Sequence, residues 1–141
     1  MVQRYILSDY SKLIDIWERA VKKTHTFLSK ESYEKIRASL EEYFNIVEIY
    51  VYKKNGKDIA FMGVKDDKLE MLFCDPDYFR QGIGTFMLNY ALNFLNIKYV
   101  DVNEANLSAI EFYKYNGFNE VARTEHDVFG YPILHLAYEN D

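Results

Sequence analysis

The sequence predicts a mixed α+β domain with a mostly antiparallel central sheet of about seven strands and about four helices. Apolar residues change between helical and strand spacing along the chain. Three strand-like segments with short turns between them stand in the middle, at residues 46–74. The resulting order, β-α-α-β-β-β-α-β-α-β-β, differs from the regular alternation of a doubly wound fold. At 141 residues the chain has the size of one domain, expected to span residues 1–141.

A strand and two helices are expected first. Residues 2–6 have strand character, and Asp9 or Ser11 can cap the helix that follows. The apolar residues of that helix recur at helical spacing and are Leu13, Ile16, Trp17, Ala20 and Val21. The pattern breaks at residues 24–26. A second helix begins at Ser29, with apolar positions Tyr33, Ile36, Leu40 and Tyr43 or Phe44.

The middle of the chain has the pattern of a three-stranded meander. Residues 46–53 are rich in Ile, Val and Tyr, and Asn55-Gly56 is typical of a tight hairpin turn. Residues 57–65 and 68–74 supply the next two strands. Pro76 ends the last of them, because proline cannot donate to a central ladder.

Two more helices and three more strands complete the chain. The first helix follows Gly82-Ile83-Gly84, and Gly117 stops the second. The expected segments are a helix over 86–95, a strand over 98–102, a helix over 106–116, and strands over 118–125 and 133–138, with Gly130 and Pro132 in the last turn.

Composition narrows the function classes. The chain is 49% hydrophobic and 28% charged, which is typical of a globular protein, and its net charge is -5. A negative charge disfavours nucleic-acid binding, which needs a basic surface. A lone cysteine, Cys74, cannot form an internal disulfide, and no apolar run approaches the length of a membrane span. We therefore expect a soluble cytoplasmic protein that binds neither nucleic acid nor membrane.

The segment Gln81–Thr85 is a candidate phosphate cradle. It lies between a strand and an amphipathic helix, where backbone N–H groups without intrahelical partners and the helix dipole favour an anion. The Gly-x-Gly spacing alone is a weak signal. Met87 stands where a dinucleotide fingerprint needs a third glycine, and the chain has no Gly-Lys-Ser/Thr. By itself the segment fits a plain glycine turn as well as a phosphate site.

Two longer sequence patterns favour the phosphate site over a plain glycine turn. Residues 69–84 read Leu-Glu-Met-Leu-Phe-Cys-Asp-Pro-Asp-Tyr-Phe-Arg-Gln-Gly-Ile-Gly, and residues 106–118 contain Asn-x-x-Ala-x-x-Phe-Tyr followed by Gly-Phe. These resemble, in order and separation, the two signatures of the GCN5-related N-acetyltransferases (GNAT). Residues 17–29 are similar to the opening of a YjaB-like bacterial subgroup. The resemblance covers nearly the whole chain and implies the GNAT fold.

The resemblance implies acetyl-coenzyme A as cosubstrate and no metal. One motif position departs from the family, because Phe79 replaces the usual Arg or Gln, and Arg80 stands where glycine is frequent. Whether this weakens coenzyme binding is left open by the sequence. The implied coenzyme-binding residues are Leu72 and Cys74 (through their backbone), Arg80, Gln81, Gly82, Ile83, Gly84, Thr85, Asn106 and Tyr113.

For catalysis, the resemblance implies that Tyr113 is the general acid that protonates the departing thiolate. An amine must lose a proton before it attacks, and Glu70 and His25 are the candidates for the base or the acceptor site. Glu70 is placed on the face of Leu72 and Cys74 by alternation, and each candidate also fits a purely structural role. Glu104, His126 and His135 are weaker candidates. The three histidines show no metal-ligand spacing.

The expected function is acetyl transfer to a primary amine, of a small molecule or of a protein lysine or N-terminus, by direct attack in a ternary complex. The alternative is a regulatory module that binds acetyl-coenzyme A or coenzyme A with little turnover. A third reading treats the glycine turn as structural and the chain as an interaction domain. The protein is expected to be a monomer or a homodimer.

Overall fold

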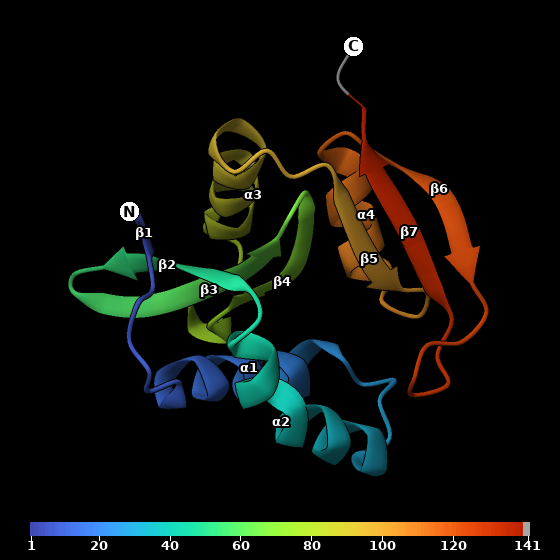
Figure 1. The fold of residues 1–141 in the computed structure, drawn as a ribbon, viewed down its shortest axis with the longest axis horizontal. Coiled ribbons are helices and arrows are strands. Elements are labelled where there is room, and N and C mark those ends of the chain that lie inside the picture. The colour runs from blue at the N-terminus through green and yellow to red at the C-terminus, as the bar shows by residue number, and fades with distance from the viewer. Residues whose placement is uncertain (140–141) are drawn as a thin grey trace. The chain divides into compact units, whose positions relative to one another are not determined.

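The computed structural model describes residues 1–139, in two compact units that divide after Ile97 (Figure 1). Within these residues the two units together hold seven strands and four α-helices in the predicted order, so the mixed α+β class is confirmed. A short 3-10 helix, Pro76–Tyr78, was not predicted. A single domain over residues 1–141 stays a prediction, and residues 140 and 141 lie outside the described part.

The first unit contains an antiparallel sheet in the order β1-β2-β3-β4. Its hairpin turn is the predicted one, since Asn55 and Gly56 both have positive φ, at 54° and 78°. The strands are β1 (Val2–Arg4), β2 (Glu48–Lys54), β3 (Lys57–Lys65) and β4 (Lys68–Cys74).

Helices cover both faces of this sheet. Helices α1 (Ser11–Thr24) and α2 (Lys30–Phe44) lie on one side and α3 (Ile83–Phe94) on the other (Figure 1). Ser29, where this helix was predicted to begin, is the N-cap of α2, and its side-chain oxygen accepts from the Ser32 N–H. The buried residues of α1 are the predicted ones: Leu13, Ile16, Trp17, Ala20 and Val21.

The cap of α1 differs from the prediction. Tyr10, rather than Asp9 or Ser11, is the N-cap residue, and its side chain makes no capping bond. The Asp9 carboxylate accepts from the Ser11 N–H at 2.9 Å, so it still satisfies a backbone donor at the start of the helix. Asp9 therefore still accepts a hydrogen bond from a backbone N–H at the start of the helix, as a capping residue does, although it lies one position before the N-cap.

The second unit is a three-stranded antiparallel sheet in the order β5-β7-β6, with α4 packed against β6. Strands β5 and β7 alternate between buried and partly exposed positions, as expected of a sheet covered on one face. Its elements are β5 (Tyr99–Asn103), α4 (Leu107–Tyr115), β6 (Phe118–Thr124) and β7 (Ile133–Tyr138).

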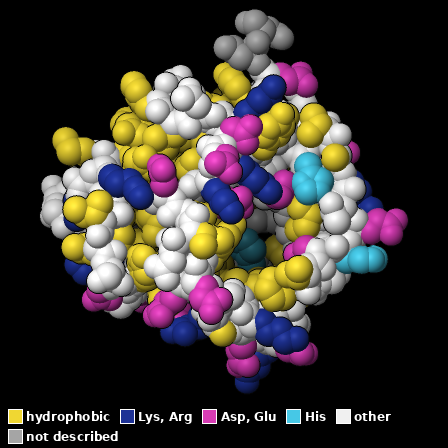
Figure 2. All heavy atoms as spheres, viewed as in Figure 1, with side chains coloured by type: hydrophobic (Ala, Val, Ile, Leu, Met, Phe, Trp, Pro, Cys, Tyr) yellow, Lys and Arg dark blue, Asp and Glu magenta, His cyan; other side chains and the backbone are white. Residues whose placement is uncertain are grey.

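Acidic and basic side chains are interspersed on the face of the molecule in Figure 2, and hydrophobic side chains also reach the surface. On α3, Phe86 and Phe94 are 52% and 70% exposed. None of the helices in residues 1–139 is long and apolar enough to span a bilayer.

Candidate active site

The predicted phosphate cradle is the turn that leads from β4 into α3. Gly82 is the N-cap of α3 and has φ +79°, a conformation that glycine adopts without strain. A Cβ built on Gly82 meets no atom within 4 Å, so the space in front of the turn is open. The first intrahelical bond runs from Phe86 N–H to Gly82 O at 2.9 Å. The N–H groups of Ile83, Gly84 and Thr85 therefore precede the helical ladder, in the arrangement that favours an anion.

The two departures from the family motif lie just before this turn. Arg80 is exposed and has φ +64°, so it takes the left-handed conformation for which glycine is better suited. Phe79 has extended backbone and is half-buried. Lys54, from the β2–β3 hairpin, donates to the Gln81 side chain at 3.3 Å. Arg80 and Lys54 thus give the cradle positive charge that Phe79 does not supply.

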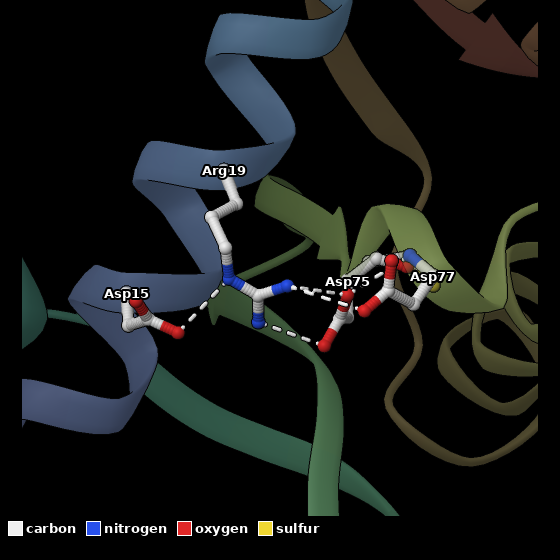
Figure 3. Close-up of polar contacts among 5 residues, drawn as sticks. Asp15, Arg19, Asp75 and Asp77 are labelled. Carbon is white, nitrogen blue, oxygen red and sulfur yellow. Dashed lines mark hydrogen bonds and ion pairs between the residues drawn. The ribbon is translucent and has the colours of Figure 1, made fainter.

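An ion pair fixes the segment in front of the cradle (Figure 3). Arg19 on α1 contacts both oxygens of Asp75, with Nη1–Oδ1 and Nη2–Oδ2 distances of 2.7 Å. The Asp75 side chain is only 1% exposed, whereas Arg19 is 38% exposed. The Arg19 guanidinium lowers the pKa of Asp75, and the Asp77 N–H, which also bonds to the carboxylate, lowers it further.

Backbone hydrogen bonds also hold the segment around Asp75 in place. The Asp75 N–H donates to Ile59 O at 2.8 Å, and the Tyr78 N–H donates to Asp75 O at 2.9 Å. The sequence indicated Arg19 only as part of the family-like opening, and Asp75 only as the end of a strand. Their pairing across 56 positions could not be read from either pattern.

The thiol of Cys74 is not suited to act as a nucleophile. Burial raises its pKa to about 11, so the thiol stays protonated at neutral pH. Its Sγ lies 3.4 Å from Asp75 O, to which it donates. That Cys74 contributes its backbone to coenzyme binding stays a prediction.

Glu70 lies at an irregular point of β4. In the register with β3, Met71 is opposite Gly63 and Leu69 is opposite Val64, so Glu70 has no partner position. Alternation counted from Leu72 and Cys74 therefore does not determine its direction. The hydroxyl of Tyr43, on α2, donates to the Glu70 carboxylate. Glu70 is thus tied to the α2 side of the first unit.

His25 lines a pocket of about 500 Å³ between the end of α1 and the start of α2, together with Val21, Tyr33 and Glu34. Burial lowers its pKa, so the ring is neutral at pH 7. The Thr24 hydroxyl donates to Ala20 O at 2.8 Å and lies 2.7 Å from His25 Nδ1. Since that hydroxyl proton is engaged, Nδ1–H is the donor to Thr24, and Nε2 keeps the lone pair.

Asn106 and Tyr113 both belong to α4, in the second unit. The Asn106 side chain is the N-cap, accepting from the Ala109 N–H at 3.3 Å. Tyr113 is buried, with its ring 5.5 Å from that of Phe118. Burial raises the pKa of Tyr113, so the phenol is protonated at neutral pH and can serve as a donor.

The structure also shows the positions of the three weaker candidates for the base. Glu104 forms an ion pair with Arg123, and His126 is exposed beyond β6. His135, on β7, contacts Asp101 and Thr124. In residues 1–139, no group of three His, Cys, Asp or Glu side chains is arranged to hold a metal ion.

Comparison with known proteins supports the class that these features define, a coenzyme A-dependent acyltransferase. The family model described as an acetyltransferase (GNAT) domain matches residues 45–120, which is more than half of the chain. The chain is 35% identical over 130 residues to the peptidyl-lysine N-acetyltransferase YjaB of Salmonella typhimurium, covering 90% of each protein.

Solved structures agree with this. The apo form of YjaB from Escherichia coli superposes with a TM-score of 0.89 at 30% identity, over 100% of this chain and 98% of that one. The PaiA N-acetyltransferase of Thermoplasma acidophilum, solved with coenzyme A, shares the fold at 20% identity, with a TM-score of 0.69 and coverage of 98% and 99%.

The chain belongs to the GCN5-related N-acetyltransferase family. It is therefore an enzyme that transfers acetyl from acetyl-coenzyme A to an amine, and the predicted fold, activity and cosubstrate are confirmed.

Proposed function

We propose that this protein acetylates the ε-amino groups of lysine residues in proteins. The observation that carries the proposal is the similarity to a peptidyl-lysine N-acetyltransferase, which extends over 90% of both chains. A similarity of this extent spans the cradle, the pocket at His25 and α4 together. Lysine side chains of proteins are therefore the acceptor class that the comparison favours.

The cradle suits the phosphates of the coenzyme. Open space before Gly82 lets a ligand approach the backbone, and the N–H groups of Ile83, Gly84 and Thr85 supply donors there. Arg80 and Gln81 flank these donors. We assign the pantetheine arm to the backbone of Leu72 and Cys74, by analogy with strand addition at a sheet edge.

Direct attack in a ternary complex is the mechanism that the side chains support. Cys74, with its raised pKa, does not offer a thiolate for a covalent acetyl intermediate. Tyr113 remains protonated and is assigned the role of the acid at the departing sulfur. Asn106 caps α4 and thereby holds the helix that carries Tyr113.

The pocket at His25 is assigned to the acceptor. A lysine side chain has an apolar stem and a cationic end, and the pocket combines the Val21 and Tyr33 side chains with the Glu34 carboxylate. Lys22 and Lys30 also line the pocket, and their positive charges favour the neutral amine, which is the form that attacks, over its ammonium form. Glu70, held by Tyr43, is assigned to the same side of the unit as a polar residue of the acceptor region.

Thiol release from acetyl-coenzyme A tests the proposal across four acceptors of matched length. These are a lysine peptide with a blocked N-terminus, the same peptide with acetyl-lysine, a lysine-free peptide with a free N-terminus, and a linear diamine. We expect release with the first peptide and none above background with the second. Fastest release with the diamine or the free N-terminus would contradict the acceptor class. Binding of acetyl-coenzyme A without release on any acceptor would instead favour the regulatory module.

A further inference from the structure

The pocket at His25 lies against the strand to which the pantetheine arm is assigned. The His25 ring is 6.1 Å from the ring of Phe73 on β4. In that strand Phe73 stands between Leu72 and Cys74. All four residues belong to the first unit, and the ion pair described above holds the end of the same strand against α1. An acceptor side chain bound in this pocket is therefore close to the end of β4.

Apolar and aromatic side chains line part of the pocket. Val21 is buried, and Leu28 is half-buried. The Tyr33 ring stacks on the ring of Trp17, with a centroid distance of 5.2 Å. These surfaces suit the methylene groups of a lysine side chain, whose cationic end needs polar surroundings. The charged groups at the pocket therefore decide which acceptor lysines bind best.

Two lysines stand on opposite sides of this pocket in the sequence. Lys22 is in the last turn of α1, and Lys30 is the first residue of α2. Both are exposed, and Lys22 Nζ lies 5.8 Å from the centroid of the Tyr33 ring. We call Lys22 and Lys30 the rim lysines. Among the described residues that line the pocket, Glu34 is the one carboxylate.

The carboxylates near the pocket do not neutralise the rim lysines. Glu18 forms an ion pair with Arg37, and Glu31 lies 3.1 Å from Lys35 Nζ. Within residues 1–139 neither the rim lysines nor Glu34 form an ion pair. The positive charge of the rim lysines is thus available to a ligand.

The position of Lys30 is unfavourable for the helix that carries it. The dipole of α2 disfavours a cation at its N-terminus, where Lys30 stands. Glu34 follows four residues later, but a lysine that precedes a glutamate is in the weaker order for a helical pair. Residues that break a local rule without a compensating contact are expected at functional sites. The placement of Lys30 therefore favours a role in binding over a role in helix stability.

We propose that Lys22 and Lys30 select acceptor segments in which acidic residues flank the lysine that is acetylated. The inference rests on the proposed function, because it specifies the lysine acceptor of the same pocket. Two cations at the pocket repel the ammonium group of an approaching acceptor. Carboxylates on either side of that acceptor offset the repulsion, because they pair with the rim lysines. The partner is thus a protein segment with a lysine between Asp or Glu residues.

The charge of the whole protein does not oppose this preference at the pocket. The net charge is -5, so no long-range attraction of an acidic segment is expected. At physiological ionic strength, however, exposed charges are screened beyond about 8 Å. Contacts with the rim lysines therefore decide the preference, rather than the sum of distant charges.

Three peptides of equal length test the inference on the full-length protein. Each has blocked termini and one lysine, with two Glu, two Gln or two Arg residues on each side of it. Two exposed ion pairs correspond to about two- to thirtyfold in kcat/KM, so thiol release should be more than about twofold more efficient with the Glu peptide than with the Gln peptide. The Arg peptide should be the poorest. Raising the salt from about 0.1 M to about 1 M should reduce these differences.

Charge reversal at the pocket gives a second measurement. The double variant Lys22→Glu, Lys30→Glu should prefer the Arg peptide to the Glu peptide, which a merely structural role would not produce. The ratio is taken within each variant, so a change in its overall rate does not affect the comparison. Lys30→Glu also places an acidic residue where the helix dipole favours one, so α2 should be retained.

Lys23→Glu is the matched control for charge reversal. Lys23 is exposed in the same last turn of α1, but it is not among the residues that line the pocket. The variant has the same kind of charge change and should keep the preference for the Glu peptide. A reversed preference in Lys23→Glu would show that general surface charge, rather than the rim lysines, selects the acceptor, and would overturn the inference.

The outcomes separate the inference from the proposed function. If the Glu and Gln peptides are acetylated with kcat/KM values within about twofold of each other, the preference is overturned and acetylation of lysine stands. The same holds if the double variant keeps the wild-type order of peptides. If the wild-type protein releases no thiol with any of the three peptides, both are overturned.

Discussion

Arg19 and Asp75 hold the end of β4 against α1 through two parallel contacts of 2.7 Å each. A planar guanidinium matches a carboxylate in this geometry, and the pair is made where the strand passes into the segment before the predicted cradle. The Asp75 side chain is 1% exposed, so its charge depends on Arg19 for compensation. The conformation of the segment before the cradle is thus coupled to a helix more than fifty residues earlier.

Arg19→Ala is expected to destabilise the protein by about 3 kcal/mol, because it leaves a buried carboxylate without its partner. Urea unfolding at pH 7 measures the loss. Arg37→Ala is the matched control, since Arg37 pairs with Glu18 at an exposed site and should cost much less. Equal losses in the two variants would contradict the special role of the buried pair.

The same pair predicts a pH dependence of stability. Because the pKa of Asp75 is lowered in the folded protein, the native state binds fewer protons than the unfolded chain. The stabilisation is complete above the unfolded pKa of about 3.9 and is lost as pH falls through the lower folded pKa. Unfolding free energies of wild type and Arg19→Ala should therefore converge below about pH 4. A constant difference down to pH 3 would contradict this.

Gly82→Ala is expected to weaken acetyl-coenzyme A binding. The left-handed φ of +79° strains any side chain, and the added methyl occupies the open space through which a phosphate would approach. Gly130→Ala is the matched control, since Gly130 has φ +87° and equally open surroundings but lies outside the cradle. Calorimetry should show an affinity loss in the first variant only, although both lose about 1 kcal/mol of stability.

The Arg80→Gly variant distinguishes the contribution of the backbone to coenzyme binding at the cradle from that of the Arg80 charge. Glycine takes the φ of +64° without strain, so the turn should be kept and stability should rise slightly. If the side chain contributes charge to phosphate binding, the affinity for acetyl-coenzyme A should fall and depend less on salt. An affinity and salt dependence equal to those of wild type would assign binding to the backbone alone.

Tyr113→Phe is expected to lower kcat strongly without weakening coenzyme binding, since it removes only the proton that protonates the leaving thiolate. Tyr115→Phe, on the same helix, is the control because Tyr115 is 91% exposed. Stopped-flow measurement of thiol release, with calorimetry for binding, checks both. Unchanged turnover in Tyr113→Phe would exclude this residue as the acid.

Much of the fold was determined locally and could be predicted. The five buried residues of α1, the Asn55-Gly56 turn and the beginning of α2 at Ser29 depend on spacing and on the chemistry of single residues, so they could be predicted from the sequence. The boundaries shifted by one to three residues, and α3 begins at Ile83 rather than Phe86. Contiguous motifs indicated the candidate cradle and Tyr113 for the same reason, and their roles stay predictions.

The tertiary structure determined which charged and polar side chains contact each other. Arg19 with Asp75, Tyr43 with Glu70, and His135 with Asp101 each join residues at least 27 positions apart. Such pairs arise from strand register and helix packing, which no local pattern encodes. The bulge at Glu70 shows the same limit, because a single extra residue in β4 removes the alternation on which its direction was predicted. By itself the sequence determined the family and indicated a candidate cradle, and the packing of distant elements determined which polar side chains meet.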